Sequence, residues 1–303
     1  MIDFVGKKQW FFLISGILIV AGIISLAVFG LKPGIDFAGG TSMILQFSPP
    51  VEQSQLREEM AELGYAKATI QNAREGNFII HIGEIPSKEA SELAEKLGAE
   101  LDSQVKIIDY YLASPTVGAE TARNAGIAVI IAAVAMLFYI VWAFRRMPKP
   151  FRWGTCAIIA LIHDVLIIMG IFSLLGWLAG VEIDAMFITG LLAVVGYSIN
   201  NTVVIFDRIR ENVSRHISPD FAVTVNSSIV ETLGRSLNTS LTTLFIILAL
   251  LLFGGATIYY FVLVLLFGVI IGTYSSVCIS SQLLVVWEKK EWRALLPFTK
   301  RTA

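Results

Sequence analysis

The stretch AMFITGLLAVVGYSINNTVVIFDRIREN, residues 185 to 212, gives the clearest indication of fold class in this chain. Its first part, as far as Phe206, is uncharged and mostly apolar. This part is longer than the roughly 20 residues that a helix needs to cross a bilayer. The run then stops abruptly at alternating acidic and basic residues. We therefore predict that it is a transmembrane span that ends at a membrane surface.

The composition of the whole chain also indicates a membrane protein. Hydrophobic residues make up 55% of the 303 residues, and the mean hydropathy is +0.72, more than a soluble domain of this size can bury. The formal net charge of −1 gives no reason to expect nucleic acid as a partner. The two cysteines, Cys156 and Cys278, lie in apolar segments, so we expect buried side chains rather than a disulfide or a metal site.

The uncharged runs of the chain account for six membrane spans. Three runs cross once, a fourth is interrupted only by Asp164, and the last is long enough for two crossings with a turn at FGGAT, residues 253 to 257. The first run is too long for a signal peptide, so we expect it to remain as a helix. The five runs are Gln9–Leu31, Asn124–Phe144, Trp153–Val181, Ala185–Phe206 and Ser236–Trp287.

Basic residues are distributed unevenly among the ends of these spans. All the clusters share one side of the membrane if both termini are cytoplasmic, which is the side where Lys and Arg accumulate. The short loop with Glu182 and Asp184 then faces out. The clusters are Lys7 and Lys8, Arg145 to Arg152, Arg208 to Arg215, and Lys289 to Arg293.

The domain organisation follows from these spans. We predict an N-terminal segment with the first span (1–31), an outer domain (32–123), five further spans (124–287) with a cytoplasmic loop at 207–235, and a cytoplasmic tail (288–303).

The outer domain is predicted to have an α+β fold. Apolar residues alternate at 41–47, 78–82 and 105–112, as in half-buried strands, and a shorter strand is expected at 68–71. The helices are expected to carry Leu56, Met60 and Leu63 before Gly64, and Ala90, Leu93, Ala94, Leu97 and Leu101 after Pro86 and Ser87, with a turn at Glu75 and Gly76 between the middle strands. This βαββαβ order is that of a ferredoxin-like domain.

Two polar features of the outer domain have simple structural interpretations. His81 lies on the strand face opposite Phe78 and Ile80, and we expect it to be a solvated surface histidine. The segment GIDFAGGT, residues 34 to 41, concentrates glycines that allow positive φ and close backbone approach. We predict a tight turn between the first span and the sheet, formed by Gly34, Gly39 and Gly40 and capped by Asp36.

Motifs of common enzymes are missing from the chain. The sequence has no Ser/His/Asp or Cys/His set, no GxxxxGK loop and no pair of histidines at metal-binding spacing. We therefore expect neither an enzyme nor a metal or other cofactor. Any energy that the protein uses has to come from a partner or from the gradient across the membrane.

Asp164 is the most informative polar residue within the spans. It lies 11 residues after Trp153, near the expected midplane of the membrane. An ionisable group at this depth is costly, so it indicates either a proton or ion step or a neutral carboxyl that hydrogen-bonds a neighbouring helix. His163 points about 100° away around the helix and is expected to pack rather than to relay protons.

A second polar patch lies in the span that ends at Phe206. Ser198, Asn200, Asn201 and Thr202 follow one another closely there. Asparagine does not titrate, so the patch can bind, orient or hydrate but cannot itself carry a proton. Hydrogen bonding between helices is the simpler interpretation.

The last two spans add an arginine and a stripe of small residues. Arg235 follows a segment, 219–233, whose apolar residues recur every fourth position, as in a helix that lies in the membrane interface. Arg235 either extends to the interface or reaches inward as a counter-charge to Asp164. Small residues at four-residue spacing predict close helix packing, and they are Gly268, Gly272, Ser276 and Ser280. The apolar positions in the segment are Phe221, Val225, Ile229 and Leu233.

Together these motifs resemble the SecF family, the smaller subunits of the SecD–SecF accessory complex of bacterial protein export. The resemblance covers nearly the whole chain, and the motifs occur in the family's order. They are GIDFAGG, HDV at 163–165, VEID at 181–184, GYSINNTVVIFDRIREN, ETLGRSLNTSLTTL and LFGG.

The resemblance implies an RND-superfamily fold, in which six spans form half of a transporter bundle. It implies a subunit of the bacterial inner membrane, with both termini cytoplasmic, that uses the proton motive force to assist late preprotein translocation and release. The partners that it implies are SecD in a heterodimer, the SecYEG channel, YajC, the translocating preprotein and membrane lipids.

The chain departs from the family pattern at one position. The family usually has an aspartate of the proton path where this chain has Asn201. Asp164 is then the remaining carboxylate within the spans, and Arg235 matches the family's arginine. The resemblance thus groups Asp164, Asn201 and Arg235, with Asn200 and Ser198, as the candidate proton path. Two alternatives are an RND-type exporter of hydrophobic compounds that forms a homodimer, and an assembly factor that moves no protons, which Asn201 favours.

Overall fold

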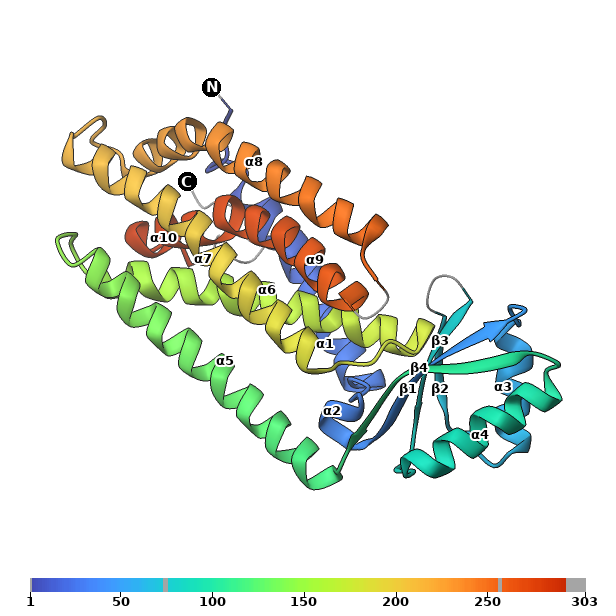
Figure 1. The fold of residues 1–303 in the computed structure, drawn as a ribbon. Coiled ribbons are helices and arrows are strands. Elements are labelled where there is room, and N and C mark those ends of the chain that lie inside the picture. Colours follow the sequence, from blue (N-terminus) through green and yellow to red (C-terminus); the bar gives the residue numbers. More distant parts are fainter. Residues whose placement is uncertain (1, 73–75, 256–257, 293–303) are drawn as a thin grey trace.

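A bundle of long helices with a small α+β domain at one end forms the computed structural model, which describes residues 2–72, 76–255 and 258–292 (Figure 1). Within these residues, six helical segments are long and apolar enough to cross a membrane, which confirms the predicted number of spans. They are α1 (Lys8–Phe29), α5 (Pro115–Ala143), α6 (Pro150–Ala179), α7 (Ala185–Ser214), α8 (Phe221–Phe253) and a last segment made of α9 (Tyr259–Ser275), η2 (Ser276–Ser280) and α10 (Ser281–Lys289).

The outer domain has the predicted βαββαβ order, preceded by one short helix. Its four strands form an antiparallel sheet in the order β2-β3-β1-β4, the arrangement of a ferredoxin-like domain. Helices α3 and α4 cover one face of the sheet (Figure 1). The elements are α2 (Ile35–Ala38), β1 (Gly40–Ser48), α3 (Gln53–Glu62), β2 (Thr69–Asn72), β3 (Asn77–Ile82), α4 (Ser87–Glu100) and β4 (Gln104–Ala113).

Two predicted turns are only partly described. Gly76 has a φ of 74°, as a turn between β2 and β3 requires, but Glu75 lies outside the described residues. Helix α8 ends at Phe253 and Gly254 follows it, whereas the last two residues of the FGGAT turn lie outside the described residues. The same is true of Arg293 and of the tail beyond it.

Helix α5 begins inside the range that we assigned to the outer domain. Ser114 caps it, since its hydroxyl accepts a hydrogen bond from the backbone N–H of Val117 at 3.4 Å, and Pro115 fits the first helical position. The first turns of α5 are therefore polar, and the apolar run that starts at Asn124 is only its second part.

The predicted interfacial helix at 219–233 is wrong, because the segment is the first part of the continuous helix α8. Its apolar stripe packs onto the bundle, where Val225 and Ile229 are fully buried in a cluster with Phe206 of α7. A hydrogen bond from Asn212 of α7 to Ser228 at 2.9 Å joins the two helices at the same place. A partner helix, not lipid, thus covers the stripe.

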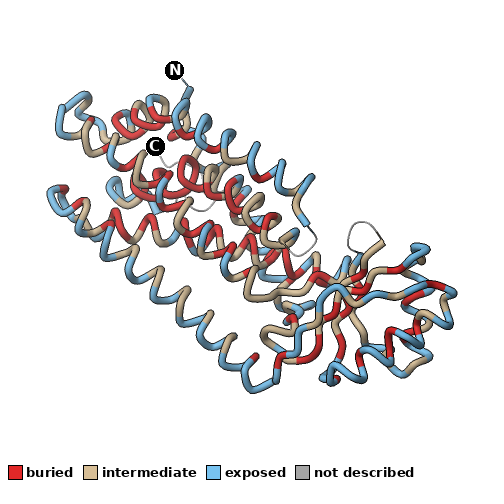
Figure 2. The backbone as a smooth tube through the Cα atoms, in the orientation of Figure 1, coloured by how far each residue is buried: buried red, intermediate tan, exposed pale blue. Residues whose placement is uncertain are grey.

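Burial is concentrated in α6, α7 and the last segment, whereas α5 is exposed along most of its length (Figure 2). Cys156 and Cys278 are buried and free, as predicted. Helix α1 packs on α6 through a glycine contact, and a Cβ atom at Gly170 would stand 2.4 Å from Cα of Gly22. Next to this contact, Ser25 donates a hydrogen bond to Ser173 at 3.0 Å.

We predict that Gly170→Ala destabilises the bundle by about 1 to 3 kcal/mol, because the added methyl group meets the backbone of α1, which cannot move aside without separating the helices. Thermal unfolding of the purified protein in detergent measures the effect. Gly16→Ala is the matched control, since a Cβ there meets nothing within 4 Å. Equal melting temperatures for the two variants would contradict the close contact of α1 and α6.

Candidate functional site

Asp164 lies on α6 and is wholly buried between three helices. Its Oδ2 accepts hydrogen bonds from the hydroxyls of Ser198 on α7, at 2.6 Å, and Ser275 on α9, at 2.8 Å. Its Oδ1 lies 2.8 Å from Nδ1 of His163. Buried polar groups need such partners, and here they come from segments that are far apart in the sequence. The carboxyl group therefore joins α6, α7 and α9 at one point.

His163 does not point away from Asp164 as we expected. Its side chain is only 4% exposed, and its ring folds back so that Nδ1 reaches the neighbouring carboxyl group. The ring also stacks on Tyr274 of α9, with 6.3 Å between the centroids. The hydroxyl of Tyr274 is held by Ser15 and by the backbone oxygen of Phe11, both of α1 and both at 3.1 Å. Packing from α1 and α9 thus determines an orientation that helix geometry alone does not.

The polar patch on α7 is divided among different surroundings. Ser198 bonds to Asp164, and Thr202 donates to the hydroxyl of Ser276 at 3.2 Å. Asn201 is 3% exposed, and its Nδ2 has no hydrogen-bond partner among the described residues. Asn200 is exposed on the outer surface of the bundle. The structure therefore brings Ser198 to Asp164, whereas no hydrogen bond within the described residues joins either amide to that carboxyl group.

Arg235 is exposed, and its guanidinium group forms no ion pair within the part of the chain that the structure describes. Of the two alternatives for Arg235, the inward counter-charge to Asp164 is therefore not present in this structure. The neighbouring polar side chains of α8 face outward too, namely Asn238, Thr239 and Thr242.

The small residues of the last segment allow α9 to approach α7 closely. A Cβ atom at Gly268 would stand 1.9 Å from Val194, and one at Gly272 would stand 3.0 Å from Cβ of Ser198. This close approach holds Ser198 and Ser275 within reach of the same carboxyl oxygen.

The chain adopts a π-helical turn, η2, directly after Ser275. The hydroxyls of Ser280 and Ser281 both donate to the backbone oxygen of Ser276, at 2.9 and 2.8 Å. These hydroxyls supply hydrogen bonds at a point where the wider π-helical turn interrupts the regular backbone hydrogen bonds of the α-helix. Such single π-turns within helices occur frequently at functional sites.

A second group of residues joins the outer domain to the bundle. The N–H of Gly34 donates to the backbone oxygen of Ile183 at 2.7 Å, and the N–H of Ile183 donates to that of Lys32 at 2.8 Å. Asp36 does not cap its own turn as we expected. Its carboxylate instead accepts from the N–H of Ala185 at 3.0 Å, so it caps the start of α7 beside Asp184.

The predicted tight turn is confirmed only at Gly39 and Gly40, because Ile35–Ala38 form the short helix α2 and Gly34 has an ordinary φ of −74°. The φ angles of Gly39 and Gly40 are 78° and 124°. A Cβ atom at Gly39 would stand 2.6 Å from the backbone nitrogen of Pro115, and one at Gly40 would stand 2.5 Å from the backbone oxygen of Ile82. Only glycine fits, because the turn lies directly against the start of α5 and the end of β3.

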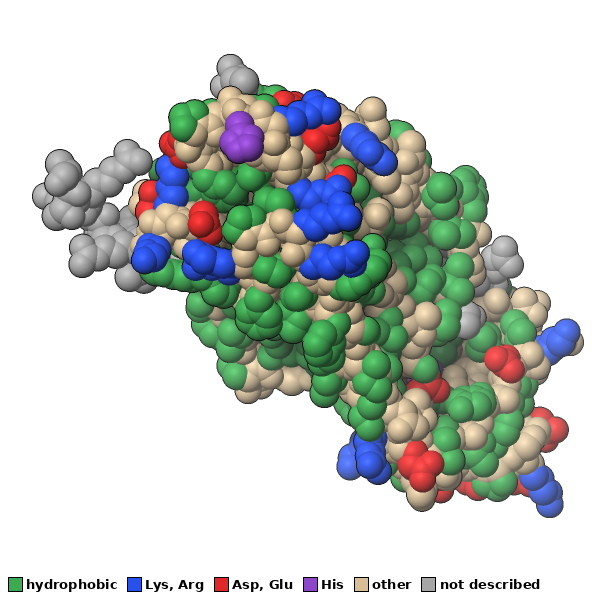
Figure 3. All heavy atoms as spheres, turned by 90° about the vertical axis from the view of Figure 1, so that its left-hand side faces the viewer, with side chains coloured by type: hydrophobic (Ala, Val, Ile, Leu, Met, Phe, Trp, Pro, Cys, Tyr) green, Lys and Arg blue, Asp and Glu red, His purple; other side chains and the backbone are tan. Residues whose placement is uncertain are grey.

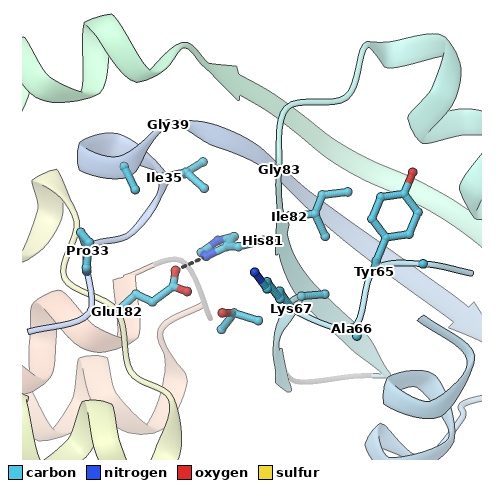
Figure 4. A pocket seen from close by; sticks show the side chains of 14 residues that line it. Pro33, Ile35, Gly39, Tyr65, Ala66, Lys67, His81, Ile82, Gly83 and Glu182 are labelled. Atoms are coloured by element: carbon cyan, nitrogen blue, oxygen red, sulfur yellow. Dashed lines mark hydrogen bonds and ion pairs between the residues drawn. The ribbon is translucent and has the colours of Figure 1, made fainter. Parts of the chain in front are cut away.

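His81 is not a free surface residue as we expected, since Nδ1 of its ring contacts the carboxyl group of Glu182, in the loop between α6 and α7. The exposed fractions of the two side chains are 19% and 11%. They line a pocket of about 460 Å³ between the outer domain and the bundle, into which the amine of Lys67 also points (Figure 4). No group of His, Cys, Asp and Glu that could hold a metal ion was found in residues 2–72, 76–255 and 258–292.

Comparison with known proteins identifies the family. The family model described as "Protein export membrane protein SecD/SecF, C-terminal" matches residues 93–290, and the "SecD/SecF GG Motif" model matches residues 24–51. The "Protein translocase subunit SecF" of Thermobaculum terrenum is 42% identical, with 100% of this chain and 99% of the relative covered. The chain belongs to the SecF family. The SecF of Anaerolinea thermophila is 40% identical over 97% of this chain and 96% of its own length.

Other relatives carry a SecF-like part within a longer chain. "Protein translocase subunit SecDF" of Bacillus subtilis is 35% identical over 95% of this chain, which corresponds to 38% of its own length. The crystal structure of SecDF from Thermus thermophilus has a TM-score of 0.84, with 34% identity and 95% of this chain covered. SecDF in a super-membrane-facing form has a TM-score of 0.69 over 96% of this chain. The chain spans 39% of each of these two solved chains.

Sequence reasoning identified Asp164 and Ser198 but missed Ser275, Glu182 and the role of His163. Ser275 stands among several serines of an apolar segment, and the sequence does not indicate which of them faces α6. Glu182 and His81 are 101 positions apart, so their contact is visible only once the outer domain is docked on the bundle.

Asp184 provides a test of the junction. Burial raises the pKa of its carboxyl group above 3.8, the charge of Asp36 raises it further, and the hydrogen bond from the N–H of Phe187 opposes both. Since the folded state holds this proton more tightly than the unfolded state does, stability is lost as the pH rises through the interval above 3.8. At neutral pH the charged carboxylate therefore destabilises the folded protein.

We predict that Asp184→Asn melts at a higher temperature than the unsubstituted chain at pH 7, since asparagine keeps the cap without the charge. The difference should disappear as the pH falls toward 3.8. Asp184→Ala is the control, and because it lacks both the charge and the cap it should be about 1 kcal/mol less stable than Asp184→Asn at every pH. Detergent melting curves at several pH values measure both variants. A difference between Asp184→Asn and the original chain that does not change with pH would contradict the charge argument.

Proposed function

We propose that this chain is the SecF-type subunit of the bacterial protein-export machinery, which with SecD uses the proton motive force to assist late preprotein translocation and release. The observation that carries the proposal is the match to SecF subunits over essentially the full length of both chains. Its relatives are translocase subunits, and we propose a non-enzymatic role without a cofactor, in which the proton gradient supplies the energy.

The buried carboxyl group supports the proton step. Asp164 lies in the middle of α6, is wholly buried, and is held by hydroxyl groups of two other helices. Ionisable residues placed in this way within a membrane bundle commonly form proton relays. We propose that Asp164 takes the role that an aspartate at position 201 has in the family pattern.

SecD is the proposed partner on the outward face of α7 and α8. Asn200, Arg235 and Asn238 are exposed there, although they belong to membrane-spanning helices. Polar side chains facing lipid are costly, so a protein partner is the favoured neighbour. In Bacillus subtilis a SecF-like part and a longer remainder belong to one SecDF chain, which supports a SecD-like neighbour.

The outer domain also has an uncovered edge. Strand β4 is the last strand of the sheet and is ten residues long, with Ile108, Tyr111 and Leu112 exposed. Long apolar edge strands are normally paired or covered. We propose that this edge, too, is covered within the complex with SecD.

The proposed location is the bacterial inner membrane with both termini cytoplasmic. Figure 3 shows Lys and Arg side chains gathered at the end of the bundle remote from the outer domain, where Arg152 pairs with Glu288 at 2.6 Å and Lys289 with Asp220 at 2.9 Å. Cytoplasmic ends of membrane proteins carry such an excess of basic residues. In this orientation the outer domain faces the preprotein that leaves the channel, and SecYEG and YajC complete the proposed assembly within the lipid bilayer.

An assembly factor that moves no protons is the second candidate, and Asn201 favours it. This residue cannot titrate, and no hydrogen bond joins its side chain to Asp164 in the described part of the chain. The two candidates differ in what the loss of Asp164 does to gradient-driven translocation.

We predict that Asp164→Asn lowers gradient-stimulated completion of preprotein translocation to the level measured without a gradient, because asparagine keeps a polar group but cannot bind a proton. The assay uses inverted membrane vesicles that contain this chain, SecD and SecYEG. Ser173→Ala is the matched control, since it removes a buried hydrogen bond of the same helix outside the site. An unchanged gradient response in Asp164→Asn would favour the assembly factor.

We further predict that the chain with Asn201 and its Asn201→Asp variant both respond to the gradient, since Asp164 is present in both. The same vesicles measure both responses. A response from the aspartate variant alone would place the proton site at position 201 and would show that the chain with asparagine is uncoupled.

A further inference from the structure

One buried polar atom next to Asp164 has no hydrogen-bond partner among the described residues. Both carboxyl oxygens have partners, since Ser198 and Ser275 donate to Oδ2 and Nδ1 of His163 lies against Oδ1. The other ring nitrogen of His163, Nε2, is buried and has no hydrogen-bond partner among the described residues. A buried nitrogen without a partner is costly, and in native proteins such groups call for a specific explanation.

The charged groups near His163 and Asp164 limit the possible explanations for the unpartnered Nε2. Of the described side chains bonded to Asp164, only His163 can carry a positive charge, because α7 and α9 contribute serine hydroxyls. Tyr274 of α9 faces the imidazole ring, and its hydroxyl is bonded to Ser15 of α1. No Lys or Arg side chain of the described residues forms an ion pair with Asp164.

Burial of the pair in a low-dielectric interior favours the state without net charge. With an ionised Asp164 and a neutral His163 the pair carries −1, and one further proton makes it neutral. Two groups in direct contact take up such a proton as a unit, so the pair and not either residue titrates. Two serine hydroxyls donate to Oδ2, and Nδ1 of His163 adds a third donor at Oδ1 when it carries a proton, so the hydrogen bonds suit a carboxylate and leave the imidazole ring as the place for the proton.

We propose that His163 and Asp164 bind the transported proton together, and that Nε2 of His163 is the atom at which this proton enters and leaves. In the loaded state both ring nitrogens carry a proton, and Nδ1–H donates to Oδ1 of the ionised Asp164. In the released state the proton on Nε2 has gone, while Nδ1–H and the two serine hydroxyls still solvate the carboxylate. The inference rests on the proposed function, since it specifies how its proton step occurs.

The first experiment separates a proton acceptor from a residue that only positions Asp164. In His163→Asn, the side-chain amide can donate to Asp164 from about the place of Nδ1, but it cannot take up a proton. We expect this variant to purify with SecD and to lose the gradient response in inverted vesicles. His216→Asn is the matched control, because His216 is exposed and its side chain contacts the backbone oxygen of Ser214 at the end of α7, far along the helix from the site. A normal gradient response in His163→Asn would overturn the proposal.

The second experiment observes the proton directly and needs no translocation. The chain contains three histidines, so nitrogen-15 labelling of histidine gives few signals, and the His163→Asn variant assigns those of His163. At alkaline pH the two ring nitrogens should differ, one protonated and one bare, and on acidification both should become protonated. In Asp164→Asn the doubly protonated form should be lost, because the compensating carboxylate is gone. A His163 signal that is unaffected by pH or by Asp164→Asn would contradict the proposal.

The two experiments separate this inference from the proposed function. If Asp164→Asn abolishes gradient-driven translocation but His163→Asn does not, the inference fails and the proposed function stands. If the nitrogen signals show the coupled pair but Asp164→Asn leaves gradient-driven translocation unchanged, the pair binds a proton and the proposed function fails.

Discussion

The cost of burying the carboxyl group of Asp164 is the constraint on which the helix bundle depends. A carboxyl group in an apolar interior has to be hydrogen-bonded, and the donors here come from α7 and α9. They reach it only because Gly268 and Gly272 let α9 lie directly against α7. The small-residue stripe, the serines and the π-turn η2 of the last segment therefore belong to one arrangement around Asp164.

The junction between the outer domain and the bundle follows a different principle. It is made of backbone hydrogen bonds, which depend on the path of the chain, and of two helix caps, which need the carboxylates of Asp36 and Asp184. Side-chain identity also matters elsewhere in the junction. Glycines at 39 and 40 let the turn approach α5 and β3, and the pair of His81 and Glu182 closes the side of the pocket.

The sequence predicted what depends on hydropathy and periodicity. The six spans, the βαββαβ domain and the two buried cysteines follow from patterns that each segment contains by itself. The errors concern residues whose surroundings come from distant segments. His163 is turned toward Asp164 by packing from α1 and α9, and the stripe at Val225 and Ile229 has the spacing of an interfacial helix but is covered by α7. Asp36 looked like a local cap because its true partner, Ala185, lies 149 positions away.

The double cap on α7 has a consequence for how the molecule responds to its cargo. Asp36 belongs to the segment that leads into the outer domain, and the helix that it caps carries Ser198, a donor to Asp164. If force on the outer domain shifts the start of α7, it changes the free energy with which the pair of His163 and Asp164 binds a proton. Thermodynamic linkage then requires the reverse effect to be equally large. A cargo that holds the outer domain in one position changes the proton affinity of the bundle. Proton binding in turn changes the free energy of that position of the outer domain by the same amount.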